Sequence, residues 1–469
     1  MTRATIAGGA FATMAVLLAV AAGYRALHRD VHPAAPASPA ITRPTAAAAH
    51  PGFLYGRITA LDGTAYEGRL RWGGHQEAFW GDYFNGFKGK NPWAAQVPLE
   101  RLPKERRRIE IFGIVIAHRE RPTDLGRPFM ARFGDVARIE ARGREVRVTL
   151  KSGTVFDLER LGASDLDDGV RVWDGRRGVV DLEGRIEPRL RDLLSGRGRG
   201  RIRAIELLPT PSLGAVPDRL HGTVRTRQGD FTGFVQWDRE ECVGTDDLRG
   251  RTAGGELSLR FDTIRSIARR SRDSSLVTLL DGREIVLSGT REVGYDNRGI
   301  YVDDRRYGRV LISWDAFERV DFSPGGTGGT GPAYGDFPPG SPLTGSVTTR
   351  AGRRLAGRLV YDLDESETTE TLDAPSQGVD YTIPFGLIAS IVSPGREERG
   401  AQRARVTLQV ILHSGEELQL ERTGDLGEGN AGMLIFVDGR QRPEYVPWTD
   451  VEQVDFDRPP AMYPPPGGR

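Results

Sequence analysis

The chain has 469 residues, which exceeds what a single hydrophobic core can organise and indicates about three domains. Its 65 basic and 64 acidic residues nearly cancel, which disfavours a protein whose main partner is nucleic acid. The one cysteine, Cys242, excludes an intramolecular disulfide framework and a cysteine-rich zinc site. The 60 glycines, nearly twice the usual share of ~7%, are typical of many short strands joined by tight turns.

The N-terminal segment has the pattern of an export signal. Arg3 precedes an uncharged run from Ala4 to Tyr24, and a basic residue ahead of an apolar stretch is typical of a signal peptide. The run is also long enough to span a bilayer without being cleaved. We therefore predict a signal peptide or signal-anchor helix at 1–31 and an Ala/Pro-rich linker at 32–51. The protein is expected to be exported, either to the periplasm or cell exterior or held at the membrane by this helix.

The rest of the chain repeats a strand that runs into a tight turn. In each of six openings, a β-branched residue stands five positions before a glycine. The β-branched residues are Ile58, Val148, Val224, Val277, Val347 and Val410, and the glycines are Gly63, Gly153, Gly229, Gly282, Gly352 and Gly415. A glycine there supplies the positive φ of a two-residue hairpin turn, so the pattern predicts six β-hairpins.

A second pattern closes the repeats. An aromatic residue is followed three positions later by an apolar residue, and three positions after that by Ile or Val. The five aromatics are Phe133, Phe261, Trp314, Phe385 and Trp448. This spacing predicts one turn of 3₁₀-helix leading into a last strand. In four cases the turn glycine and the closing aromatic are 32 or 33 residues apart.

A hairpin, further strands, a 3₁₀ turn and a short last strand resemble the small five-stranded barrels of the SH3-like and Sm-like type. The resemblance concerns the fold, and it implies no activity. The predicted fold class is all-β: tandem small five-stranded SH3-like barrels, as six half-repeats in three long repeats, after an N-terminal apolar helix.

The composition places the boundaries between the long repeats. Repeat 1 is expected at 52–209, repeat 2 at 218–324 and repeat 3 at 341–458, each made of two barrels. A Gly/Pro-rich segment at 325–340 predicts a flexible connector, and the Pro/Gly-rich tail at 459–469 predicts disorder.

Repeat 1 carries an aromatic insertion at 75–128 that the other repeats lack. The interval from its turn glycine to its closing aromatic is 70 residues. The candidate binding residues are Trp80, Asp82, Tyr83, Phe84, Asn85 and Trp93. Aromatic rings beside amide and carboxylate groups could stack on sugar rings and bind their hydroxyls. The alternative is that the aromatics form a small core that anchors the insertion.

Common catalytic patterns are missing from the sequence: it has no phosphate-binding loop, no Gly-x-Ser-x-Gly elbow and no His-Glu-x-x-His pair. The sequence therefore predicts a non-catalytic binding or scaffolding protein of the cell envelope, with no cofactor or metal and with an envelope protein or glycan as partner. An envelope enzyme of hydrolase type remains an alternative, with His75, Glu77, Asp82 and His118 as its groups. Nucleic-acid binding by analogy with Sm-like barrels is a second alternative. The oligomeric state is left open.

Overall fold

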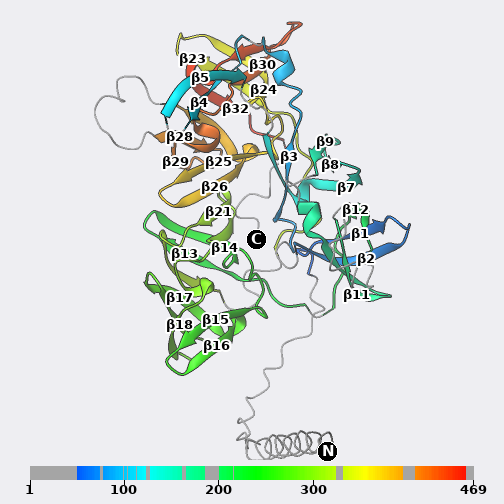
Figure 1. Cartoon of the computed structure of the whole chain (residues 1–469), viewed down its shortest axis with the longest axis vertical. Coiled ribbons are helices and arrows are strands. Elements are labelled where there is room, and N and C mark those ends of the chain that lie inside the picture. The colour runs from blue at the N-terminus through cyan, green and yellow to red at the C-terminus, as the bar shows by residue number, and fades with distance from the viewer. Residues whose placement is uncertain are drawn as a thin grey trace, which may run out of the picture. The chain divides into compact units, whose positions relative to one another are not determined.

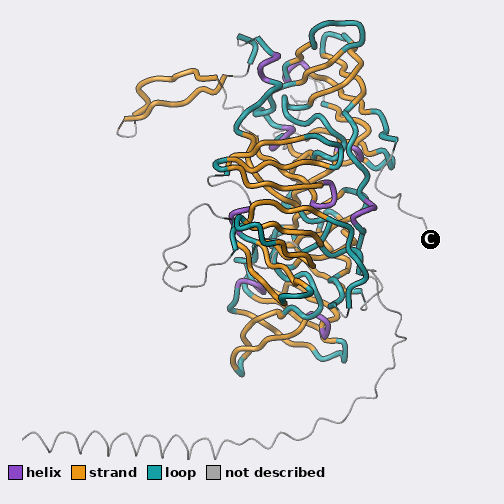
Figure 2. The backbone as a smooth tube through the Cα atoms, turned by 90° about the vertical axis from the view of Figure 1, so that its right-hand side faces the viewer, coloured by secondary structure: helices purple, strands orange, loops and turns teal. Residues whose placement is uncertain are grey.

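The structure is a computed structural model that describes most of the chain after residue 49. The described ranges are 50–73, 78–98, 100–102, 104–111, 114–122, 127–160, 165–184, 200–214, 216–323, 331–393 and 407–460, with the backbone alone for 104–122. Strands make up most of this backbone, and its helices are short 3₁₀ turns (Figure 2). The prediction of an all-β fold is confirmed for this part.

The predicted N-terminal helix lies outside the described residues, as do 461–469 of the predicted disordered tail. In the ranges given above, no helix has both the length and the hydropathy needed to cross a membrane.

The described residues of repeat 1 form twelve strands and three 3₁₀ turns. They are β1 (Tyr55–Ala60), β2 (Ala65–Trp72), β3 (Tyr83–Lys88), η1 (Ala94–Gln96), β4 (Lys104–Ile111), β5 (Ile114–Pro122), β6 (Arg127–Arg132), η2 (Phe133–Asp135), β7 (Val136–Arg142), β8 (Glu145–Leu150), β9 (Val155–Glu159), η3 (Asp165–Asp168), β10 (Val170–Asp174), β11 (Gly178–Leu182) and β12 (Ile202–Leu207). The hairpin β4–β5 belongs to the insertion and pairs only with itself among the described strands.

In the part of the chain that the structure describes, repeats 2 and 3 have ten strands each. Repeat 2 has β13 (His221–Thr226), β14 (Gly229–Gln236), β15 (Asp247–Thr252), β16 (Gly255–Arg260), η4 (Phe261–Thr263), β17 (Ile264–Ser271), β18 (Ser274–Leu279), β19 (Glu284–Ser288), η5 (Arg291–Val293), β20 (Ile300–Asp304), β21 (Gly308–Ile312) and β22 (Phe317–Phe322). The turn η6 (Tyr334–Asp336) lies between the two repeats. Repeat 3 has β23 (Thr344–Thr349), β24 (Arg354–Val360), β25 (Thr371–Ser376), β26 (Val379–Pro384), η7 (Phe385–Leu387), β27 (Ile388–Val392), β28 (Thr407–Leu412), β29 (Glu417–Glu421), η9 (Gly424–Leu426), β30 (Met433–Phe436), β31 (Glu444–Val446), η10 (Trp448–Asp450) and β32 (Val451–Phe456).

All three repeats use one strand order. Repeat 1 forms the sheet β11-β10-β2-β1-β12-β7-β8-β9, and repeat 3 forms β31-β30-β24-β23-β32-β27-β28-β29. Repeat 2 has the same eight strands in the same order, β21-β20-β14-β13-β22-β17-β18-β19, within a sheet of twelve. The internal repetition seen in the sequence therefore corresponds to a repeated topology.

The half-repeats exchange strands, which the sequence interpretation did not anticipate. It expected the strand of Val224 to close on that of Ile267, and the strand of Val277 to close on that of Val320. Instead Val224 pairs with Val320, and Val277 pairs with Ile267. Each five-stranded group thus combines strands from both halves: β22-β13-β14-β20-β21 and β17-β18-β19-β15-β16. The hydrophobic pattern is the same in both halves, so it specifies the type of strand and its buried face but not its partner.

The twelve-stranded sheet joins repeat 2 to repeat 3. Strand β21 pairs antiparallel with β26, with Arg309 opposite Thr382 and Leu311 opposite Asp380, so the hairpin β25–β26 extends the sheet of the preceding repeat. Figure 1 shows β21 and β26 side by side at this junction.

The residues that carry the repeat pattern behave as predicted. The closing aromatics are buried, and four of them begin a 3₁₀ turn, at η2, η4, η7 and η10. All six turn glycines have a positive φ, from 77° at Gly352 to 140° at Gly229. The hairpin prediction is therefore confirmed, and the prediction of a closing 3₁₀ turn is confirmed at four of the five aromatics but is wrong at Trp314.

The described end of the Gly/Pro segment, 331–340, does not form the expected free connector. Phe337 is buried, and a Cβ placed on Gly134 would lie 2.3 Å from its ring. Lys151 Nζ donates to the carbonyl oxygens of Tyr334 and Phe337, at 2.6 and 3.0 Å. Two aromatic side chains with this much apolar surface outweigh the flexibility of the surrounding glycines, and they hold the segment against repeat 1.

Candidate functional site

Two of the predicted binding residues belong to the core of repeat 1. The Trp80 side chain is fully buried, its Nε1 donates to Pro51 O and Thr210 Oγ1 at 2.9 and 3.0 Å, and its ring lies 4.5 Å from that of Tyr334. Phe84 is also fully buried, against Trp72. These two rings therefore serve the packing of repeat 1 and present no surface to a ligand.

Asp82 joins repeat 1 to repeat 2. Its Oδ2 accepts hydrogen bonds from the backbone N–H groups of Ala78 and Phe79, at 2.8 and 2.9 Å. Its Oδ1 forms a 2.6 Å ion pair with Arg309, whose side chain is buried. Arg309 also contacts Asp303 Oδ1 at 2.7 Å, so the buried carboxylate of Asp82 and the partly exposed carboxylate of Asp303 share one guanidinium.

Asn85 and Trp93 also make structural contacts. The Asn85 side chain donates to Asp165 Oδ2 at 2.9 Å; burial raises the pKa of Asp165 to about 6, and the Asn85 hydrogen bonds oppose that rise. The Trp93 ring lies 6.0 Å from that of Phe436 in repeat 3, and the Arg358 guanidinium lies 5.3 Å from it. The end of the insertion thus packs on repeat 3.

Buried ion pairs reinforce that contact. The Lys88 ammonium lies 2.6 Å from Asp364 Oδ1 and 3.4 Å from Glu370 Oε1, and Arg127 lies 3.2 Å from Asp362. Burial alone would lower the pKa of Lys88, but the carboxylates of Glu370 and Asp364 outweigh it and raise that pKa. The insertion therefore connects repeat 1 to both other repeats.

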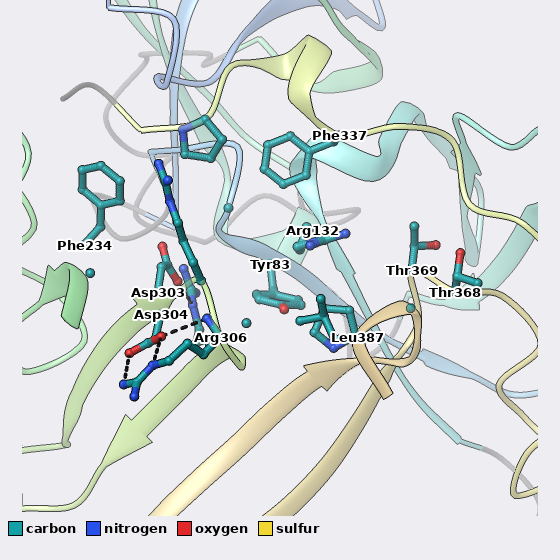
Figure 3. Close-up of a pocket in the computed structure, with 18 of the residues that line it drawn as sticks. Tyr83, Arg132, Phe234, Asp303, Asp304, Arg306, Phe337, Thr368, Thr369 and Leu387 are labelled. Atoms are coloured by element: carbon teal, nitrogen blue, oxygen red, sulfur yellow. Dashed lines mark hydrogen bonds and ion pairs between the residues drawn. The ribbon is translucent and has the colours of Figure 1, made fainter. Parts of the chain in front are cut away.

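Tyr83 differs from its neighbours because it lines a cavity. The cavity has a volume of about 700 Å³, and its walls come from all three repeats and from the segment 332–339. Figure 3 shows Tyr83 among residues from these parts of the chain. Of the six residues predicted for binding, only Tyr83 lines this cavity.

The walls of the cavity are largely apolar. The rings and side chains on them are Tyr83, Phe234, Phe337, Leu387, Pro332, Pro338, Pro339, Pro384 and Pro459. Aromatic and prolyl rings are rigid, so ordering a ligand against them costs little side-chain entropy.

The charged residues of the cavity are mostly paired with one another. Arg306 binds both carboxylate oxygens of Asp304, at 3.0 and 2.7 Å, and Asp303 binds Arg309 (Figure 3). Arg305 differs from Arg306 because it is exposed and has no ion-pair partner among the described residues.

Two polar groups of the cavity also have no hydrogen-bond partner within the described ranges. Thr369 Oγ1 is buried and unpartnered, and the Tyr83 hydroxyl makes no hydrogen bond there. Burial raises the pKa of Tyr83, so its hydroxyl keeps its proton and can donate. Burial also lowers the pKa of His221, which leaves that imidazole neutral at pH 7. The cavity thus offers the guanidinium of Arg305, the carboxylate of Asp230 and two hydroxyls to a ligand.

Sequence reasoning missed most of this cavity. Phe234, Arg305 and Thr369 come from three separate parts of the chain, and no local pattern distinguishes them. One signal could have revealed how the repeats are joined: Asp82, Asp246 and Glu370 each accept two backbone N–H groups three and four residues before them. Each of these three carboxylates also contacts a basic residue of another repeat. Asp82 contacts Arg309, Asp246 contacts Arg71, and Glu370 contacts Lys88.

The alternative enzymatic group is not assembled by the described residues. His75 and Glu77 lie outside them, as does the side chain of His118, and Asp82 is held by Arg309. In the described part of the chain, no cluster of three or more His, Cys, Asp or Glu side chains could hold a metal ion. Comparison with known proteins gives no match to a family model, to a curated protein or to a solved structure.

Proposed function

We propose that the protein is a binding protein whose ligand occupies the cavity between the three repeats. The observation that carries the proposal is the composition of this cavity, in which rigid rings surround a guanidinium and hydroxyl groups without partners. Ligand sites are typically concave, mostly apolar and equipped with a few polar groups that fix orientation. A volume of about 700 Å³ is within the usual range for such sites.

The charges favour an anionic ligand. Four arginines and three aspartates line the cavity, so its net charge is positive. The carboxylates of Asp303 and Asp304 are bound by arginines, while Arg305 and the exposed Asp230 have no ion-pair partner among the described residues. A guanidinium binds a carboxylate in a planar, two-pronged geometry. The ligand we propose therefore combines a ring-shaped or apolar body with a carboxylate, as an acidic sugar or the end of a peptide does.

We also propose the setting that the sequence predicts, a non-catalytic binding or scaffolding role at the cell envelope, from the export-type pattern at 1–31. Each five-stranded group is proposed to be a small barrel of the SH3-like type. The support for this is the grouping of five antiparallel strands and, in the group β23-β24-β30-β31-β32, the 3₁₀ turn η10 that leads into the last strand. The exchange of strands between half-repeats would make each pair of barrels one unit.

The test is a thermal-shift titration with matched acidic and neutral probes. N-acetyl-phenylalanyl-proline, as free acid and as carboxamide, represents a peptide end, and digalacturonate and digalactose represent a glycan. We expect at least one acid to raise the melting temperature and its neutral counterpart to have a much smaller effect. Arg305→Glu should remove the shift, and Thr369→Val should reduce it because the buried hydroxyl is lost.

The matched control is Arg227→Glu, which reverses the charge of an exposed arginine that does not line the cavity. This control should keep the full shift. The proposal is contradicted if neither acid binds, or if Arg305→Glu and Arg227→Glu weaken binding equally.

A further inference from the structure

The junction between repeats 2 and 3 defines two complementary strand edges. Strand β21 ends one five-stranded group of repeat 2, and β26 ends the hairpin of repeat 3, and they pair along four residues from Arg309 to Ile312. Because the three repeats share one topology, each repeat has a counterpart of both strands. The counterparts of β21 in the shared strand order are β11 and β31. The counterparts of β26 are β6 and β16, because each of these strands likewise runs directly into a 3₁₀ turn that begins with a closing aromatic.

The counterparts of β21 differ in what covers their outer edge. In repeat 3, Arg101 of the insertion donates to the carbonyl oxygen of Tyr445 in β31 at 3.2 Å and lies over its ring. In repeat 1, β11 pairs only with β10 among the described strands, and Val179 on it is 57% exposed. An unpaired edge of this kind presents a row of N–H and C=O groups that another strand can bind.

The second strand needed for the pairing is a counterpart of β26, and β16 is more exposed than the other counterpart, β6. Four of the six residues of β16 are exposed, whereas only one residue of β26 is. Strand β16 ends the twelve-stranded sheet and pairs only with β15 among the described strands. Repeats 1 and 2 therefore lack the strand pairing that joins repeats 2 and 3, although both strands needed for it are present.

We propose that β11 of one copy of the chain pairs antiparallel with β16 of a second copy, in the register of β21 and β26. That register places Val180 opposite Leu257, as Val310 lies opposite Tyr381 at the internal junction. The side chains of Val180 and Leu257 are both apolar, which favours cross-strand contact between them. Asp181 and Glu256 also meet, and each already has an arginine partner on the neighbouring strand, Arg171 and Arg251.

The contact is heterologous, because two different edges meet. Each chain carries both edges, so two copies can pair reciprocally into a closed dimer, and an open row forms where the geometry does not close. The proposal is independent of the ligand in the cavity, since neither β11 nor β16 lines it.

The test mixes two variants of the full chain that each carry one new cysteine, Val180→Cys and Leu257→Cys. The native Cys242 is buried, and burial raises its pKa to about 12, so it does not react in the folded state. Under mild oxidation we expect a disulfide between positions 180 and 257, which in this mixture can only link two chains. Its rate should exceed that of the control mixture of Val180→Cys with Tyr295→Cys by about tenfold, because pairing raises the effective concentration.

Two results overturn the proposal: equal rates in both mixtures, or a variant with both cysteines that links within one chain only. If either variant melts at a lower temperature than the native chain, Val179→Cys and Ser258→Cys take its place. These positions are opposite each other in the same register.

Discussion

Repeat 2 and the insertion of repeat 1 are held in place by different forces. In repeat 2, Val224, Ile267, Val277 and Val320 are fully buried and meet across neighbouring strands, so apolar contact dominates. In the insertion, contacts with repeat 3 combine buried charge, such as that of Lys88 between two carboxylates, with an apolar cluster that includes Val97 and Leu102. The comparison teaches that apolar layers stabilise each repeat, whereas the contacts between repeats combine small apolar clusters with buried ion pairs and therefore depend in part on ionisation.

The largest loss of stability is expected from a substitution in the apolar core of repeat 2. Trp237 is fully buried, with its ring 5.3 Å from that of Phe317, and its Nε1 donates to Glu292 O at 2.8 Å. Trp237→Ala should lower the free energy of unfolding by about 3–5 kcal/mol, measured by denaturant titration. The matched control, Tyr295→Ala, removes an exposed ring and should cost less than about 0.5 kcal/mol. Similar losses for the two variants would contradict an apolar core at this position.

Removing the cation from an ion-pair contact between two repeats should lower the free energy of unfolding nearly as much. Lys88→Ala leaves Asp364 and Glu370 buried without their partner, which should cost about 3 kcal/mol at pH 7. The control is Lys90→Ala, because the Lys90 side chain is 91% exposed and should contribute almost nothing. Hydrogen exchange can locate the effect, which we expect at β25 and the loop before it. Unchanged protection there, together with equal stability of both variants, would rule out a joint based on charge.

Glu241 gives the stability a defined pH dependence. Burial and the nearby Glu292 raise its pKa to about 8, from an ordinary value of 4.5. Since the folded state holds this proton more tightly than the unfolded state, stability should fall as the pH rises from about 5 to about 8, by at most ~1.4 kcal/mol per pH unit. Glu241→Gln keeps the side chain neutral, so it should flatten this fall and be the more stable form at pH 8. Glu240→Gln, at a 40% exposed side chain, is the control and should keep the native slope.

The smallest loss of stability is expected from a substitution at the contact between the insertion and repeat 3. Trp93 is half-buried and contacts Phe436 and Arg358. Trp93→Ala should cost about 1 kcal/mol, the usual worth of an aromatic pair and a partly exposed cation–π contact. Unfolding followed by circular dichroism measures this loss. A cost comparable with that of Trp237→Ala would show that apolar packing, and not charge, secures the insertion.

The sequence predicted the repeated elements well and the joints poorly. Turn glycines such as Gly282 and closing aromatics such as Phe261 act within a few residues of themselves, so their spacing reports local backbone geometry. The partner of β13 depends on a strand about a hundred residues away, and equal patterns in both halves leave that choice open.

The same reasoning explains what was missed at the candidate site. Trp80 and Phe84 were interpreted as possible binding groups because their aromatic character was visible, while their burial depends on Tyr334 and Trp72 in distant segments. Tyr83, between them in sequence, lines the cavity because successive residues of a strand point to opposite faces. Arg305 and Thr369 have no local signal at all, since the cavity exists only where three repeats meet.

The exchange of strands within each repeat is tested most directly by cysteine pairs in repeat 2. Thr223 lies opposite Asp321 on the neighbouring strand β22, and Ser266 lies opposite Asp321 on the far side of the same strand. Thr223→Cys with Asp321→Cys should form a disulfide rapidly in the folded protein. Thr223→Cys with Ser266→Cys should not, because two strand spacings of ~4.8 Å separate these positions. The opposite result, in which positions 223 and 266 cross-link and positions 223 and 321 do not, would contradict the exchange and support self-contained half-repeats.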